Sequence, residues 1–214
     1  MESGGGRGVI MFAPENGIYI SNDKNITLDG AFLFAYGKDW VLQEALDQHA
    51  VLKKFCPTSV NTMRINTYRS YEDENIYIIS GALRIGQKGK VVDNGHAGGG
   101  LIGINMETGE LGDQVVNERG DRYTEFNGID FANKKDKYVI PNWEHIKSFC
   151  KEVAQYNKHC RLLSLDVALT KEGLPMLIEW NVAPFSFSYW IPMYTGAIPF
   201  GDKTEEIIKY CKNR

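Results

Sequence analysis

The sequence of 214 residues lacks the cysteine and histidine patterns of domains held together by metals or disulfides. Its four cysteines lie far apart and form no CxxC pair, so we expect neither a zinc site nor a disulfide framework. The four histidines show no metal-ligand spacing either. Reduced thiols are the default state in the cytoplasm, and we expect a cytoplasmic protein.

Long apolar runs and an excess of one charge are also missing. No apolar run approaches the roughly 20 residues that span a bilayer, and Met1–Arg7 has no apolar region of a secretory signal. The net charge of −3 gives no general attraction to nucleic acid or to an anionic membrane. We therefore expect no membrane span and no nucleic-acid partner. An anion such as a nucleotide would have to be bound by local charges and a metal.

The apolar pattern that is present predicts a mainly β protein with a few helices. We expect strands at residues 9–12, 17–21 (after a turn at 14–16), 31–35, 60–68, 76–85, 101–105 and 112–116, and helices at 41–55, 141–157 and 203–212. Many of the 22 glycines lie within 4–8 and 95–103. Such clusters mark turns or places where the backbone comes close to another group.

The most informative segment is Leu162–Asn181, where two apolar-rich runs flank the turn signal Lys171–Leu174. If the two middle residues of that turn form the loop, Asp166 lies directly opposite Glu179. Side chains alternate between the faces of a strand, so every second residue shares a face. The face away from the two acids is apolar and is predicted to be core; it carries Leu163, Leu165, Val167, Leu169, Met176, Ile178 and Trp180.

Two opposed carboxylates repel each other at a Cβ separation of about 4.5–5.5 Å, and a divalent cation would offset that repulsion. In the same register Asn181 lies opposite Ser164, on the face of Asp166 and Glu179. Carboxylate and amide oxygens are ligands that Mg²⁺ prefers. The alternative is a solvent-exposed strand face with scattered polar residues, and a slip of one residue would separate the two acids.

The segment DVALTKEGLPMLIEWNVAPFS, with Asp166, Glu179 and Asn181, resembles the closing hairpin of the ATP-grasp superfamily. Three further segments, SVNTMRINTY from Ser59, ALRIG from Ala82 and VVDNGHAGGG, resemble the sugar-transfer-associated ATP-grasp family, which is found with polysaccharide biosynthesis. The resemblance covers nearly the whole chain. It implies an α+β, ATP-grasp-like fold of antiparallel sheets with flanking helices, ATP and Mg²⁺ as cofactors, and Mg²⁺ ligation by the two acids and the asparagine.

The resemblance also implies nucleotide-binding residues near the N-terminus. Glycines let backbone N–H groups approach phosphate oxygens, and an arginine adds further donors. The predicted phosphate loop contains Gly4, Gly5, Gly6 and Arg7, and the predicted adenine-binding hinge contains Gln43 and Glu44. The alternatives are a glycine-containing tail and a helix start with a solvated Gln–Glu pair.

Further residues are implied at the reacting end of the nucleotide. Arg64 and Arg84 would neutralise charge on a transferring phosphoryl group or clamp a substrate carboxylate, and His96 would take a proton from the acceptor. Substrate binding is implied for Asn61, Asp93 and Asn94. The alternatives are arginines paired with surface acids and a glycine-rich turn without function.

The sequence departs from the family pattern in two ways. The family normally has a subdomain and a nucleotide-binding lysine before the phosphate loop, and here the chain begins almost at that loop. We expect a partial glycine-loop subdomain at residues 1–40 and a C-terminal ATP-grasp subdomain at 41–214, in a fragment, a truncated form or a variant completed by homo-oligomerisation. Ser164 stands where some relatives carry a basic residue.

The resemblance implies an ATP-dependent carboxylate ligase acting in cell-surface polysaccharide biosynthesis. ATP would phosphorylate a carboxylate, such as that of a sugar acid, and an amine or similar nucleophile would displace phosphate. One alternative is a nucleotide-binding module or inactive remnant without turnover. A further alternative is a small-molecule kinase that phosphorylates a hydroxyl.

Overall fold

The structure, a computed structural model, describes residues 9–21, 25–37, 40–133, 135, 137–182 and 200–212. Gly4, Gly5, Gly6 and Arg7 of the predicted phosphate loop lie outside these residues. The chain divides into two compact units, Met1–Leu46 and Asp47–Arg214. Each unit is described by itself below.

In the described residues of the first unit, β1 (Phe12–Glu15) and β2 (Ile18–Ser21) form a hairpin. Its turn is Asn16–Gly17, with φ of 52° and 83°, the backbone typical of a tight two-residue hairpin turn. The turn predicted at residues 14–16 was therefore placed too early. Asn–Gly is the stronger turn signal because both residues tolerate positive φ.

Helix α1 (Gly30–Tyr36) follows where a strand was predicted at residues 31–35. That prediction was wrong because a short apolar run does not distinguish strand from helix. Asp29 decides the outcome, since its carboxylate accepts a hydrogen bond from the Phe32 N–H at 2.8 Å and caps the helix.

The helix predicted at residues 41–55 is reduced to α2 (Ala50–Lys53) in the second unit. Residues 40–47 form neither helix nor strand, and Val41 is 85% exposed, so its apolar side chain packs on no core. The side chain of His49 accepts a hydrogen bond from the Val51 N–H at 3.2 Å and starts the helix there. The helical spacing of the preceding residues therefore had no packing partner to stabilise it.

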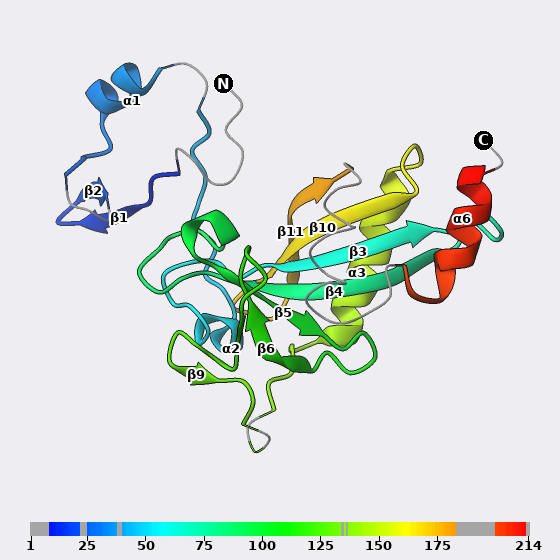
Figure 1. Cartoon of the computed structure of the whole chain (residues 1–214). Helices are drawn as coiled ribbons and strands as arrows, with labels where there is room; N and C mark the ends of the chain where they lie inside the picture. Colours follow the sequence, from blue (N-terminus) through cyan, green and yellow to red (C-terminus); the bar gives the residue numbers. More distant parts are fainter. Residues whose placement is uncertain are drawn as a thin grey trace. The chain divides into compact units, whose positions relative to one another are not determined.

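The second unit is built on a seven-stranded antiparallel sheet in the order β11-β10-β3-β4-β5-β6-β7 (Figure 1). The strands are β3 (Met63–Arg69), β4 (Ile76–Ile85), β5 (Gly100–Ile104), β6 (Leu111–Val116), β7 (Arg122–Tyr123), β10 (Leu162–Leu169) and β11 (Pro175–Asn181). A separate hairpin joins β8 (Glu125–Phe126) to β9 (Ile129–Asp130). The strands predicted at 60–68, 76–85, 101–105 and 112–116 are confirmed within a few residues, and so is the antiparallel α+β class.

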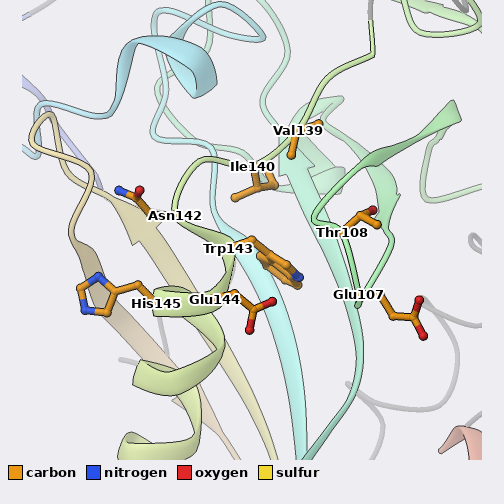
Figure 2. Close-up of a pocket in the computed structure, with 8 residues that line it drawn as sticks. All are labelled: Glu107, Thr108, Val139, Ile140, Asn142, Trp143, Glu144 and His145. Carbon is orange, nitrogen blue, oxygen red and sulfur yellow. The ribbon is translucent and has the colours of Figure 1, made fainter.

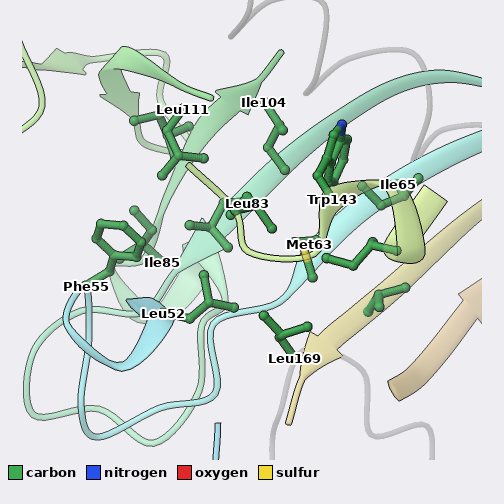
Figure 3. Packing of buried hydrophobic residues seen from close by; sticks show 14 of the residues in the cluster. Leu52, Phe55, Met63, Ile65, Leu83, Ile85, Ile104, Leu111, Trp143 and Leu169 are labelled. Carbon is green, nitrogen blue, oxygen red and sulfur yellow. The ribbon is translucent and has the colours of Figure 1, made fainter. Parts of the chain in front are cut away.

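Helix α3 (Trp143–Tyr156) runs along one face of this sheet (Figure 1) and confirms the helix predicted at 141–157. The core lies between them, because alternate strand residues such as Met63, Ile65 and Leu83 are fully buried and belong to the same cluster as Trp143 (Figure 3). The opposite face of the central strands therefore carries the intervening residues. Asp166, Glu179 and Arg64 lie on that second face.

The C-terminal helix α6 (Thr204–Lys212) follows a short 3-10 turn, η2 (Gly201–Lys203), and confirms the predicted C-terminal helix. Glu206 anchors it, since its Oε1 accepts hydrogen bonds from the Tyr68 hydroxyl and the Ser70 hydroxyl at 2.8 Å and from the Tyr71 N–H at 2.7 Å. Among the described helices, none combines the length and apolar character needed to cross a membrane.

Candidate functional site

The β10–β11 hairpin places Asp166 opposite Glu179 and Ser164 opposite Asn181, as the sequence predicted. The loop, however, is not the predicted two-residue turn. The Thr170 N–H donates to the Leu174 carbonyl at 2.9 Å, so the loop is residues 171–173, with Gly173 at φ 82°. The pairs nearest the turn are therefore offset by one residue from the predicted register.

A β-bulge at Ile178 restores the register, because Val167 pairs with Leu177 while Asp166 pairs with Glu179. Leu177, rather than its neighbours, packs against the core. The prediction of core positions for three residues of this edge strand was wrong. Met176 is 43% exposed, Ile178 is 51% exposed and Trp180 is 45% exposed.

Strand pairing arranges the polar face of the sheet in two rows. In the first row, Glu179 neighbours Asp166, Asp166 neighbours Arg64, and Arg64 neighbours Ala82. The predicted metal ligands and the first predicted arginine therefore lie on adjacent strands. The second row is formed by Asn181, Ser164, Asn66 and Ser80.

Asp166 lies at the centre of a charged cluster and is only 3% exposed. Its Oδ1 accepts from Arg64 Nε at 2.8 Å, and its Oδ2 accepts from Arg64 Nη2 and Arg84 Nη1, each at 2.7 Å. Burial acts to lower the pKa of Arg64, but the hydrogen bonds and charge of Asp166, aided by the charge of Glu179, raise it. Arg64 therefore stays charged, and both arginines donate to the predicted metal ligand.

Arg84 has further acceptors on its second terminal nitrogen, Nη2. It lies 3.0 Å from Asp93 Oδ1 and donates to Asn94 Oδ1. Asp93 is held in turn by Thr62, whose N–H and hydroxyl donate to Asp93 Oδ2 at 3.0 and 2.5 Å. Burial raises the pKa of Asp93, although the charge of Arg84 and the hydrogen bonds of Thr62 act in the opposite direction. Asp93 thus contacts Arg84 directly.

The second row is an uncharged hydrogen-bonded chain. The Ser164 hydroxyl donates to Asn66 Oδ1, and Asn66 Nδ2 donates to the Ser80 hydroxyl at 2.9 Å. Ser164 and Asn66 are fully buried. The amide nitrogen of Asn181 is buried and has no hydrogen-bond partner in the described part of the chain. Such an orphaned polar group is costly and points to a missing ligand at this position.

His96 lies in the 3-10 turn η1 (Gly95–Ala97), two residues after Asn94. Its Nδ1 lies 2.6 Å from Glu118 Oε2, and its side chain is 77% exposed. A side chain at position 95 would come within 2.8 Å of Glu118 Oε1, so glycine at this position leaves room for the pair. In the tautomer of His96 that donates from Nδ1 to this carboxylate, Nε2 is a hydrogen-bond acceptor.

Asn61, predicted to bind substrate, is fully buried and has a structural role. Its Nδ2 donates to the Leu52 carbonyl at 2.9 Å and to the Cys56 carbonyl at 3.1 Å, and its Oδ1 accepts from the Gly86 N–H at 3.2 Å. These bonds hold α2 against the sheet, and we remove Asn61 from the candidate site. Gln43 and Glu44 are exposed residues of the first unit.

Mg²⁺ requires oxygen ligands, and Asp166, Glu179 and Asn181 are the predicted ligands. No group of three or more His, Cys, Asp and Glu side chains suited to a metal occurs among the described residues; the predicted set has two carboxylates, and its third member is an amide. An ionised carboxylate can accept about four hydrogen bonds. Asp166 accepts three from the two arginines, one on Oδ1 and two on Oδ2, so one acceptor position remains on Oδ1. Glu179 is exposed and forms no ion pair with a described residue. The residues therefore fit a hard cation.

A hollow of about 590 Å³ opens at the start of α3 (Figure 2). Its lining residues are Glu107, Thr108, Val139, Ile140, Asn142, Trp143, Glu144 and His145. It belongs to the helix side of the sheet and contains no residue of the charged cluster. Its two glutamates would repel the phosphates of a nucleotide.

Sequence reasoning gave no role to Thr62 and Glu118, which contact residues of the candidate site. Thr62 and Arg64 are two residues apart. Alternate residues share a face of a strand, so this spacing was a usable signal. Glu118 had no such signal, since it meets His96 only through the fold.

Together, the antiparallel sheet, the carboxylate–arginine cluster and the hairpin of two acids and an amide form one polar site of carboxylate, guanidinium and amide groups. The chain matches the family described as sugar-transfer associated ATP-grasp over residues 1–200 of 214, and it belongs to that family. No curated protein and no solved structure matches it.

Proposed function

We propose that this chain is an ATP-dependent carboxylate ligase that forms a carbon–nitrogen bond on a sugar acid or a similar carboxylate. The observation that carries the proposal is the direct opposition of Asp166 and Glu179 on adjacent strands, with Arg64 and Arg84 on Asp166. Family membership supports the use of ATP. The association of the family with sugar transfer supports a role in cell-surface polysaccharide biosynthesis.

Asp166, Glu179 and Asn181 would hold Mg²⁺. The cluster has three carboxylates, from Asp93, Asp166 and Glu179, against two guanidinium groups, so its formal charge is −1 and it favours a cation. Bound Mg²⁺ supplies charge neutralisation and alignment for the phosphate oxygens of ATP. Rotation of the Asn181 amide would turn its oxygen into the position now held by the orphaned nitrogen.

The reaction has two steps. An oxygen of the substrate carboxylate attacks the γ-phosphorus of ATP, the bond to the β-phosphate oxygen breaks, and ADP leaves an acyl phosphate behind. The nitrogen of an amine then attacks the acyl carbon, and inorganic phosphate leaves. Arg64 and Arg84 both donate to Asp166, and a guanidinium group on this face of the sheet would stabilise the negative charge of the transferring phosphoryl group.

His96 would accept the proton that the amine loses in the second step. Its Nδ1–H···Glu118 hydrogen bond leaves Nε2 free to act as the base, and the exposed ring can reach a bound acceptor. Asn94 lies beside it in the chain and would contact the acceptor. The roles of Gly4, Gly5, Gly6 and Arg7 at the phosphates, and of Gln43 and Glu44 at the adenine, rest on the family resemblance. An ATP-consuming reaction of this kind fits the cytoplasm.

The test is ATP turnover with Mg²⁺ and a panel of sugar acids combined with amines and amino acids, measured as phosphate release and as product mass. We expect phosphate release that depends on both a carboxylate and an amine, with an amide as product. Glu179→Gln should abolish it, and Lys171→Gln, in the loop of the same hairpin, is the matched control. Binding of ATP without turnover across the panel would instead support a nucleotide-binding module, and a stable phosphorylated alcohol would support a kinase.

A further inference from the structure

The two arginines on Asp166 differ in how many other groups hold them. Arg64 donates through Nε and Nη2 to Asp166 alone, and its Nη1 donates to no described residue. Arg84 donates to Asp166 only through Nη1, and its Nη2 contacts Asp93 and Asn94. The two arginines were predicted to share one role, but their surroundings are not equivalent.

Asp93 is itself held by hydrogen bonds, so its carboxylate stays in position beside Arg84. Both hydrogen bonds of Thr62 go to Asp93 Oδ2, so Oδ1 remains for the guanidinium group. The Thr62 carbonyl also accepts from the Arg84 N–H at 2.8 Å, which ties the backbones of the two residues together. Arg84 released from Asp166 would therefore still be bound to Asp93.

From this difference we propose that Arg84 is a positioning residue, held by Asp93 and Thr62, that keeps Asp166 in place, whereas Arg64 is the residue that moves from Asp166 to a nucleotide phosphate. The inference rests on the proposed function. A cation on Asp166 weakens the attraction between Asp166 and Arg64, and the phosphates offer Arg64 a more negative partner. Arg64 has no other described acceptor to retain it, and Arg84 has two.

The experiment is NMR of arginine side chains in the full-length chain, which reports the rotation rate about each Cζ–Nη bond and the chemical shift of each Nε. Lysine substitutions at positions 64 and 84 assign the signals. In the absence of nucleotide we expect slow rotation at both terminal nitrogens of Arg84. In Asp93→Asn the rotation at Nη2 should become about tenfold faster, the equivalent of one charge-assisted hydrogen bond.

A matched pair at Thr62 separates positioning from folding. Thr62→Ser keeps the hydroxyl and should leave the Arg84 signals as in the wild type, whereas the isosteric Thr62→Val should accelerate the rotation. Melting temperatures of all variants are measured alongside, and Thr62→Val serves as the test if Asp93→Asn does not fold. Unchanged rotation at Arg84 in a folded Asp93→Asn or Thr62→Val variant overturns the positioning role.

The second arm adds the complex of Mg²⁺ with the non-hydrolysable ATP analogue AMPPNP. We expect the Nε signal of Arg64 to shift and the signals of Arg84 to stay in place. A shift of Arg84 with Arg64 unchanged, or binding detected by calorimetry with neither arginine shifted, overturns the inference and leaves the proposed function standing. If calorimetry detects no binding, the proposed function and the role of Arg64 are both contradicted. The Asp93→Asn measurement, made without nucleotide, still decides the role of Arg84.

Discussion

Two buried carboxylates of this chain, Asp166 and Glu206, are held in different ways. Glu206 is 7% exposed, and its Oε1 accepts from two hydroxyl groups and from backbone N–H groups of the β3–β4 turn. Asp166 is 3% exposed and accepts only from guanidinium groups in its side-chain contacts. The first carboxylate is thus fixed by short hydroxyl and backbone N–H donors around the β3–β4 turn, and the second by long side chains that can move.

The neighbours of the two carboxylates differ as well. Glu206 has Lys203 at 3.4 Å, within its own helix segment. Asp166 has a second carboxylate, Glu179, directly opposite on the next strand. An acid fixed by short, rigid donors serves as an anchor, whereas an acid beside another acid retains affinity for a cation. The comparison therefore separates a carboxylate that anchors a helix from one that we propose binds a cation.

The largest expected effect comes from Asp166→Asn. The amide would direct N–H groups at two charged arginines and leave them without a counter-ion, so the free energy of unfolding should fall by about 3 kcal/mol. Urea denaturation followed by circular dichroism measures it. Asp47→Asn, at an exposed pair with Lys53, is the control and should give no measurable change.

A smaller loss is expected for Glu206→Gln. Glutamine keeps an acceptor oxygen but loses the charge that strengthens the hydrogen bonds of Tyr68, Ser70 and Tyr71, so stability should fall by about 2 kcal/mol. The same urea experiment measures this change. An unchanged unfolding midpoint would show that α6 is held by other contacts.

The smallest effect is the pH dependence contributed by Glu206. Burial would raise the pKa of Glu206, but hydrogen bonds from Ser70, Tyr68 and Tyr71 lower it to about 2, against 4.5 for the ordinary group. A carboxyl with a lowered folded pKa stabilises the fold above its unfolded pKa, and this stability is lost as the pH falls from 4.5 through about 2. The stability difference between wild type and Glu206→Gln should therefore shrink over that window, in urea titrations at stepwise lower pH. A difference that is constant with pH would contradict the assignment.

The hairpin at Asp166 could be predicted from sequence only in part. The opposition of Asp166 and Glu179 is confirmed, yet two deviations from the predicted register compensate each other: a longer loop at Gly173 and a bulge at Ile178. Neither is visible in the alternation of apolar residues. The face of β11 was consequently predicted wrongly, since the bulge turns Leu177 toward the core.

Several other misses arise because long-range packing decides the outcome. Helical spacing at residues 41–47 had no core to meet, and the role of Asn61 depends on carbonyls that only the fold brings to it. Nothing in the first turn of α6 marks Glu206 as an inward-pointing anchor, because acids are common at helix starts.

The most direct measurement compares Glu179→Gln with Glu206→Gln in two assays, Mg²⁺–ATP calorimetry and urea unfolding. We predict opposite patterns: Glu179→Gln loses affinity for Mg²⁺–ATP by at least about tenfold with the unfolding free energy unchanged, because an exposed metal ligand is removed. Glu206→Gln should lose stability and keep the affinity of the wild type. Equal affinities of wild type and Glu179→Gln for Mg²⁺–ATP would contradict the metal site and the function built on it.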